Sequence, residues 1–108
     1  QGRYAVKADA NQREIVAALR DILGCTVMSL AGVGNGCPDL AVGWRGRNYF
    51  LEVKPPCGPL GGISRQTLTD AEQQWHRTWR GQRAIVTTVD QALYEIGATR
   101  VSAARKPA

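Results

Sequence analysis

The stretch PDLAVGWRGRNYFLEVK, residues 38–54, decides the fold of this chain. It contains two runs with the apolar, aromatic and β-branched content of strands, at 40–44 and 48–53. Between them lies Arg45-Gly46, a pair that is typical of a tight turn between antiparallel strands. The stretch therefore predicts a β-hairpin.

The register of that hairpin places charged side chains together. With a two-residue turn, Trp44 faces Arg47, and equal steps along both strands bring Asp39 opposite Glu52. Lys54, two residues beyond Glu52, points to the same sheet face. A turn shifted by one residue opposes Asp39 to Lys54 and keeps all three together, whereas a three-residue loop with a bulge breaks the parity.

The two carboxylates have two alternative interpretations. Directly opposed residues have Cβ atoms about 4.5–5.5 Å apart, a separation at which Asp39 and Glu52 can chelate one cation. The alternative is a cross-strand ion pair with Lys54 on an exposed sheet face. Because the neighbouring residues Leu40, Leu51 and Val53 are apolar, we expect buried surroundings, where charges are costly unless they are paired or bind a metal.

The other elements complete an α/β pattern around the hairpin. Thr69 with Glu72 forms a capping-box pattern at the start of a helix, and Asp90 is a candidate cap for the last one. Gly24 supplies a stop for the first helix. In chain order we expect a helix from Asp9 or Asn11 through about Leu23, a strand at 25–30, the hairpin strands, a helix at 70–79, a strand at 83–89 and a helix at 90–96.

Two helical glutamates and an aromatic stripe remain open to alternative interpretations. Glu14 lies at the edge of the apolar stripe of the first helix and is either a site residue or a solvated surface group. Glu72 is either a capping residue or a site group. His76, with Trp75 and Trp79 on the same stripe, is expected to pack its helix onto the sheet rather than to contact a base.

Composition limits the kind of protein. The 108 residues, 44% of them hydrophobic, suffice for a single domain with one core, for which we expect a loose lead at 1–8 and a loose tail at 98–108. The formal charge of +5 favours a polyanionic partner such as nucleic acid. No stretch reaches the roughly 18 apolar residues of a membrane span, and no secretory signal is seen, so we expect a cytoplasmic protein. Three cysteines and one histidine support neither a disulfide framework nor a structural zinc site.

These residues together resemble a known family. The resemblance is carried by Gly36-x-Pro38-Asp39 on one strand, Glu52-Val53-Lys54 on the next, the helical Glu14 ahead of them and Leu68-Thr69-x-x-Glu72 behind them. In this order they resemble the PD-(D/E)xK nuclease superfamily. The closest similarity is to the stand-alone phage and bacterial nucleases of the VRR-NUC type, which are related to Holliday-junction resolvases. It covers roughly residues 11–96.

The resemblance implies a fold and a set of roles. The fold is a restriction-endonuclease-like αβββαβ core of the α/β class, with a mixed central sheet flanked by helices. Asp39 and Glu52 are implied as metal ligands, Lys54 as the catalytic lysine, and Glu14 as the acidic residue of the first helix and a further metal ligand. Many relatives carry glutamine where Glu72 stands, and this chain differs from them there, although Gln73 is adjacent.

The resulting expectation is a Mg²⁺- or Mn²⁺-dependent endonuclease that hydrolyses DNA, with a selectivity for branched or junction DNA. We expect it to act as a homodimer in the cytoplasm of a bacterial host, as the product of a phage gene. One alternative is a nuclease-fold module that binds DNA or a protein partner without cutting. Another is a nuclease that processes RNA.

Overall fold

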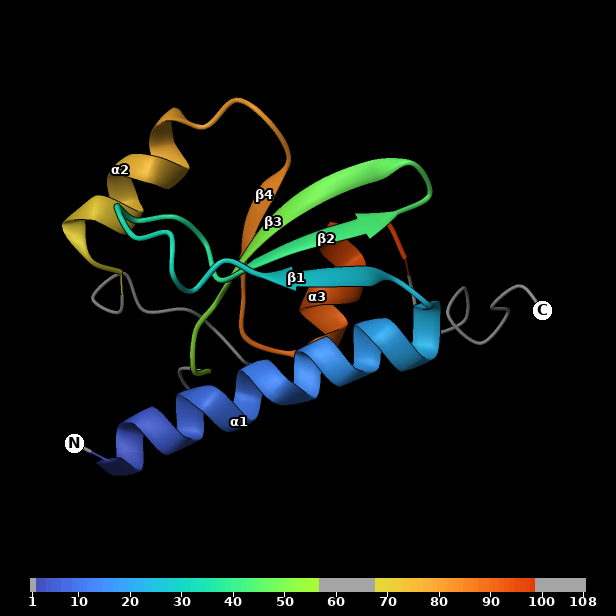
Figure 1. Ribbon diagram of the computed structural model, residues 1–108, viewed down its shortest axis with the longest axis horizontal. Helices are drawn as coiled ribbons and strands as arrows, with labels where there is room; N and C mark the ends of the chain where they lie inside the picture. Colours follow the sequence, from blue (N-terminus) through green and yellow to red (C-terminus); the bar gives the residue numbers. More distant parts are fainter. Residues whose placement is uncertain (1, 57–67, 99–108) are drawn as a thin grey trace.

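The computed structural model describes residues 2–56 and 68–98, which form a small α/β domain with a mixed sheet (Figure 1). The expected order of helix, three strands, helix, strand and helix is confirmed. The elements are α1 (Gly2–Ala18) continued by the π-helical turn η1 (Leu19–Leu23), β1 (Thr26–Ser29), β2 (Leu40–Trp44), β3 (Arg47–Val53), α2 (Asp70–Thr78), β4 (Arg83–Val86) and α3 (Val89–Glu95).

The hairpin has the predicted two-residue turn. β2 and β3 are antiparallel, with Trp44 paired to Arg47 and Leu40 paired to Leu51. Arg45 and Gly46 both have positive φ, 53° and 77°, as a type I′ turn requires. The right-handed twist of that turn matches the flanking strands, so the register on which the site depends is fixed by backbone geometry.

The four strands form one sheet in the order β1-β2-β3-β4. β1 and β2 are antiparallel, as are β2 and β3, whereas β4 runs parallel to β3. The parallel pair explains why α2 lies between β3 and β4 in the chain, because a parallel connection must cross from one end of the sheet to the other. A mixed sheet flanked by helices is therefore confirmed.

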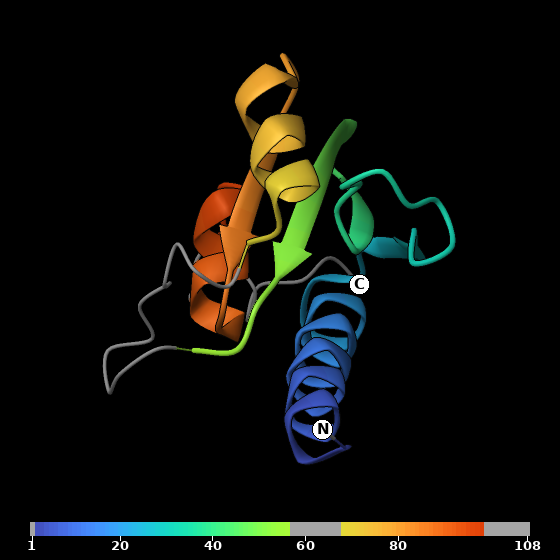
Figure 2. The same ribbon diagram turned by 90° about the vertical axis from the view of Figure 1, so that its left-hand side faces the viewer.

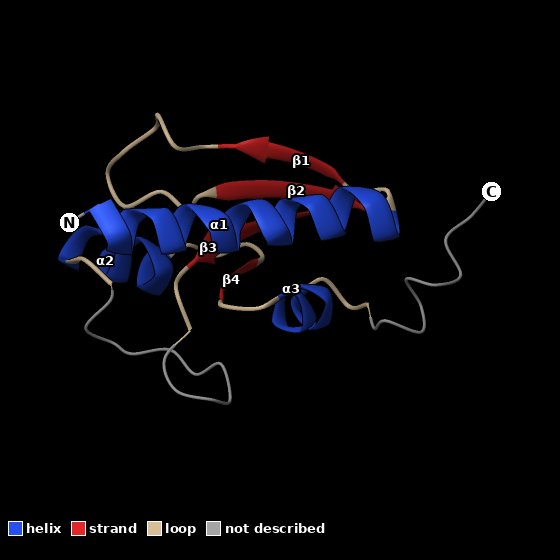
Figure 3. Cartoon of the chain, turned by 90° about the horizontal axis from the view of Figure 1, so that it is seen from below, coloured by secondary structure: helices blue, strands red, loops and turns tan. Residues whose placement is uncertain are grey.

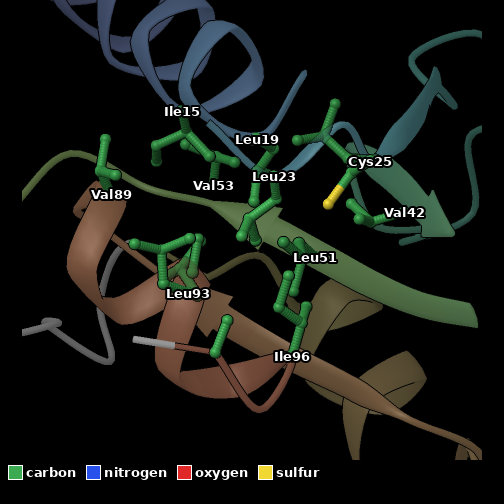
Figure 4. Packing of buried hydrophobic residues seen from close by; sticks show 14 residues of the cluster. Ile15, Leu19, Leu23, Cys25, Val42, Leu51, Val53, Val89, Leu93 and Ile96 are labelled. Atoms are coloured by element: carbon green, nitrogen blue, oxygen red, sulfur yellow. The ribbon is translucent and has the colours of Figure 1, made fainter. Parts of the chain in front are cut away.

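One face of the sheet carries the hydrophobic core. Leu40 and Val42 on β2 and Leu51 and Val53 on β3 alternate with residues of the other face, and all four are buried. Side chains of α1, η1 and α3 pack against them (Figure 4), and α1 lies beside α3 on this side (Figure 3). The core consists of Ile15, Leu19, Leu23, Cys25, Leu40, Val42, Leu51, Val53, Val86, Val89, Ala92, Leu93, Ile96 and Ala98.

The opposite face of the sheet is covered at one end by α2, so that the sheet lies between α1 and α2 (Figure 2). Phe50 of β3 makes edge-to-face contacts with Trp75 and Trp79, at ring-centroid distances of 5.6 and 5.2 Å. The two tryptophan rings stack on each other at 4.7 Å. The prediction that this tryptophan pair packs its helix onto the sheet is confirmed.

Several predicted element ends were wrong. The first helix begins at Gly2, so Asp9 and Asn11 lie inside it and neither is its cap. The reason is that 3–10 contains no glycine or proline and is rich in alanine and basic residues, which favour helix even without an apolar stripe. From Gly2 on, the expected loose lead is therefore helical.

The remaining differences concern caps and helix geometry. The last helix is capped by Thr88, whose side chain accepts a hydrogen bond from the Gln91 N–H, and not by Asp90. Gly24 ends the first helix as expected, with φ 70°, but its final turn is π-helical. The expected loose tail at 98–108 is wrong at its first residue, because Ala98 is buried in the core; residues 99–108 and 57–67 lie outside the described residues. No helix among the described residues is both long and apolar enough to cross a membrane.

Candidate functional site

The predicted carboxylates and lysine lie at the end of the hairpin that is remote from its turn. The β2–β3 ladder ends at the pair Leu40 and Leu51, and Asp39 and Glu52 are the residues that follow it, close enough for their side chains to share a hydrogen bond. Both belong to the face opposite the core, as does Lys54, since each is offset by one residue from Leu40, Leu51 or Val53. This is the face that α2 covers.

Asp39 is held by the backbone of its neighbours. Its Oδ2 accepts a hydrogen bond of 2.8 Å from the Val53 N–H, and its carbonyl oxygen accepts one of 2.8 Å from the Leu30 N–H. These bonds anchor Asp39 to β3 and to the end of β1. The carboxyl group is therefore held in place beside Glu52.

Glu52 is the most unusual side chain of the site, because it is a carboxyl group with only 2% of its surface exposed. Its Oε2 lies 3.8 Å from Lys54 Nζ, and its Oε1 has no hydrogen-bond partner. Burial raises its pKa to about 9, helped by a hydrogen bond with Asp39 and by the charges of Asp39 and Glu72. The predicted buried surroundings are confirmed, and an exposed ion pair is excluded for this residue.

Lys54 is anchored through its backbone and paired through its side chain. Its N–H donates to Val86 O at 3.0 Å, and its carbonyl accepts from Asn11 Nδ2 at 2.9 Å. Its Nζ donates to Glu72 Oε1 at 2.9 Å. Burial favours a lower pKa for Lys54, but this hydrogen bond and the surrounding carboxylates outweigh it and raise the pKa above its usual value.

Glu72 is a capping residue of α2, and its side chain also contacts Lys54. Its Oε1 accepts from the Thr69 N–H at 3.0 Å, and its own N–H donates to Thr69 Oγ1 at 3.1 Å, which completes the capping box of α2. The same Oε1 accepts from Lys54. Burial favours a higher pKa for Glu72, but the hydrogen bonds from Lys54 and Thr69 lower it below its usual value.

His76 joins the site from the next turn of α2, which sequence reasoning missed by assigning this residue to packing. Its Nε2 lies 3.9 Å from Glu52 Oε1, and both atoms are buried without a hydrogen-bond partner. Burial and the charge of Arg83 lower the pKa of His76 below its usual value. The available clue was the spacing of four residues from Glu72, which puts both side chains on one helix face.

The loop between β1 and β2 closes the site against the start of α2 (Figure 1). Gly36 has φ 79°, and a Cβ built there would lie only 2.2 Å from Ala71 O, so the close approach requires glycine. Cys37, a partly buried free thiol, follows directly. Burial raises its pKa, and so do the nearby charges of Glu52 and Asp39.

Glu14 makes no hydrogen bond or ion pair with these residues. It is exposed on α1, which packs on the core face of the sheet through its neighbour Ile15. Within the part of the chain that the structure describes, Glu14 makes no hydrogen bond or ion pair. The structure thus brings Asp39, Glu52, Lys54 and Glu72 together and leaves Glu14 outside.

The donor chemistry of the site fits a divalent cation. Among the described residues, no group of three or more His, Cys, Asp or Glu side chains is arranged so that it could hold a metal ion. Asp39 and Glu52 nevertheless offer carboxylate oxygens, which both Mg²⁺ and Mn²⁺ accept. Glu52 Oε1 in particular is buried with no donor directed at it, and a cation would satisfy it.

No family model matches this chain, and neither the curated proteins nor the solved structures give a significant match. Its function must therefore be inferred from the side chains at the end of the hairpin.

Proposed function

We propose that this protein is a divalent-metal-dependent nuclease that hydrolyses DNA phosphodiester bonds. In this proposal Asp39 and Glu52 hold the ion and Lys54 is the catalytic lysine. The observation that carries it is the buried Oε1 of Glu52, which has no partner although a second carboxyl group lies opposite it and a lysine lies beside it. The resemblance to PD-(D/E)xK nucleases supports the same roles for the same residues.

The need for these residue types follows from the substrate. A phosphodiester repels nucleophiles by its negative charge, and a bound Mg²⁺ or Mn²⁺ supplies the opposing charge and a more acidic water. Lys54 adds a second positive charge, which can orient the attacking water or stabilise the charge that builds on the phosphate in the transition state. Glu72 fixes the position of the Lys54 ammonium group through their hydrogen bond of 2.9 Å.

The substrate class follows from charge and size. The formal charge of +5 favours a polyanion, and a 108-residue chain covers only a short length of duplex. Action as a homodimer would double the contacted length and suit a branched or four-way-junction substrate. The proposal therefore includes that the protein acts as a homodimer and that it prefers junction DNA.

The test is cleavage of supercoiled and four-way-junction DNA with Mn²⁺ or Mg²⁺. Asp39→Asn and Lys54→Met should each lower the cleavage rate by about 100-fold or more, the usual effect of losing a group that stabilises transition-state charge. Glu95→Gln, which removes an exposed carboxylate of α3, is the charge-matched control and should cleave like wild type. Equal rates in all four proteins would refute the proposal.

A second candidate function is a module of the same fold that binds DNA or a protein without cutting. It is favoured by one observation, that Lys54 is already paired with the Glu72 carboxylate, which partly neutralises the charge needed for catalysis. This function predicts DNA binding that persists in EDTA, with no cleavage in Mn²⁺. Competition between DNA and RNA in the same assay separates a deoxyribonuclease from an RNA-processing nuclease.

A further inference from the structure

We propose that Nε2 of His76 is a ligand of the ion held by Asp39 and Glu52, and that this nitrogen makes the site prefer Mn²⁺, Co²⁺ or Zn²⁺ over Mg²⁺. The inference rests on the metal centre of the proposed function. It extends that centre from two oxygen-bearing side chains on the sheet to a third side chain on α2.

Two potential ligand atoms, one on the sheet and one on α2, are buried side by side and neither has a hydrogen-bond partner. Glu52 Oε1 and His76 Nε2 lie 3.9 Å apart, too far for a hydrogen bond. Two ligands of one ion, at bond lengths of about 2.1 Å, are separated by roughly 3.0–3.5 Å when they are adjacent and more when their angle widens. If the distance between Glu52 Oε1 and His76 Nε2 shortened by about half an ångström, both atoms would lie in the coordination shell of one ion.

The surroundings of the pair explain why a cation is favoured between them. The only cation that the structure places near Glu52 Oε1 and Oε2 is Lys54, among the described residues, and that lysine is 3.8 Å from Oε2 and hydrogen-bonded to Glu72 instead. Glu52 is 2% exposed and the His76 side chain 11% exposed, so solvent contributes little to either atom. Two polar atoms left buried and unsatisfied destabilise the fold, and a cation bound to both would remove that cost.

His76 is also held rigidly enough to act as a ligand. Arg83 Nε donates to the carbonyl oxygen of His76 at 2.8 Å, which ties the helix to β4. The imidazole ring makes an edge contact with Trp75, at a centroid distance of 5.1 Å. Trp75 in turn packs on Phe50 of β3, the strand that carries Glu52. These contacts between the sheet and the helix therefore keep the two ligand atoms near each other.

The predicted ion preference follows from ligand chemistry. Mg²⁺ and Ca²⁺ are hard ions that take oxygen ligands, whereas imidazole nitrogen suits Zn²⁺, and Mn²⁺ is softer than Mg²⁺ and accepts such a nitrogen more readily. A site with one nitrogen and two carboxylates should bind Mn²⁺ and Zn²⁺ more tightly than an all-oxygen site does, and should gain little for Mg²⁺. His76 would thus set which ion the protein selects.

The experiment uses the fact that His76 is the only histidine in the chain. Nitrogen NMR of the full chain gives one imidazole spin system, which is titrated with Zn²⁺ as a diamagnetic probe, without DNA. We expect the Nε2 resonance to move to the position of a metal-bound nitrogen at one equivalent of Zn²⁺. This readout needs no variant and no enzymatic activity.

Calorimetry with Mn²⁺ and Mg²⁺ completes the test. His76→Asn should weaken Mn²⁺ binding by about tenfold or more, the least that ligand-shell losses usually cost, and should change Mg²⁺ binding much less. Gln74→Asn, on the exposed side of the same helix, should bind as wild type does.

The outcomes separate this inference from the proposed function. An unmoved Nε2 resonance in a Zn²⁺-saturated protein, or equal loss of Mn²⁺ and Mg²⁺ affinity in His76→Asn, overturns the role of His76 and leaves a metal centre of Asp39 and Glu52. If Mn²⁺ binding is lost in Asp39→Asn but not in His76→Asn, the role of His76 is likewise overturned and the metal centre of Asp39 and Glu52 is kept. Absence of binding for all three ions overturns both.

Discussion

Replacing Glu52 by glutamine should make the stability of the metal-free protein less dependent on pH. In the folded protein the pKa of Glu52 is about 9, against an ordinary value of 4.5 for the unfolded chain. Between these values the folded state keeps a proton that the unfolded state has lost. The free energy of unfolding therefore falls as pH rises, by about 1.4 kcal/mol per pH unit for this one group.

The magnitude can be measured above neutral pH, where other groups interfere least. From about pH 7 to about pH 8.5 wild type should lose about 2 kcal/mol relative to Glu52→Gln, which keeps the shape of the side chain and cannot ionise. The pKa of His76 is lowered by burial and by the charge of Arg83, and this histidine is present in both proteins, so its contribution to the slope cancels in their difference. Urea denaturation of both proteins in EDTA, at four pH values, gives the difference directly.

A difference between the two proteins that stays constant over this window would refute the electrostatic reasoning. Addition of Mn²⁺ is the second arm of the experiment. The ion should stabilise wild type increasingly as pH rises, because binding displaces the Glu52 proton, and should stabilise Glu52→Gln much less. Stabilisation of both proteins to the same extent would place the ion elsewhere.

Three further predictions concern how α2 and the loop before β2 hold the site. Gly36→Ala should lower the free energy of unfolding in urea by about 2 kcal/mol or more, since its Cβ would meet the first turn of α2, whereas Gly32→Ala, with open space around it, should change it by less than about 0.5 kcal/mol. Thr69→Ala should cost about 1 kcal/mol in the same assay through loss of the helix cap, and an unchanged urea midpoint would contradict the capping role. Glu72→Gln should keep the cap but lower the pKa of Lys54, which carbon NMR of its ε-methylene group will show; an unchanged pKa would mean that their hydrogen bond does not form in solution.

The hairpin and its charged residues could be predicted because they depend on local rules. A type I′ turn needs two residues, and the register that follows pairs Leu40 with Leu51, which brings Asp39 and Glu52 together just beyond that pair. The start of α2 was predictable for the same reason, since Thr69 and Glu72 satisfy each other within one turn. The shifted turn and the bulged loop were the alternatives, and the backbone of Arg45 excludes both.

The position of His76 could not be predicted, because it depends on how a helix packs on a sheet. Its distance from Glu52 is set by the contacts of Phe50 with the tryptophans of α2, which join residues far apart in sequence. The approach of Gly36 to α2 is a contact of the same kind. The start of the first helix was missed for a different reason, since the apolar pattern on which the prediction relied begins only near Ile15, whereas the helix begins at Gly2.

Because side chains alternate along β2 and β3, the number of residues in each strand decides which side chains face the core and which face the site. This short stretch of the hairpin supplies Leu40, Leu51 and Val53 to the hydrophobic core. On the opposite face it supplies Asp39 and Glu52 to the site. An inserted or deleted residue in either strand would exchange the two sides, turning a carboxylate toward the core and a leucine toward the ion. Homologous chains should therefore keep the distance between the two carboxylates at thirteen positions, Asp39 to Glu52, even where the side chains of these strands differ.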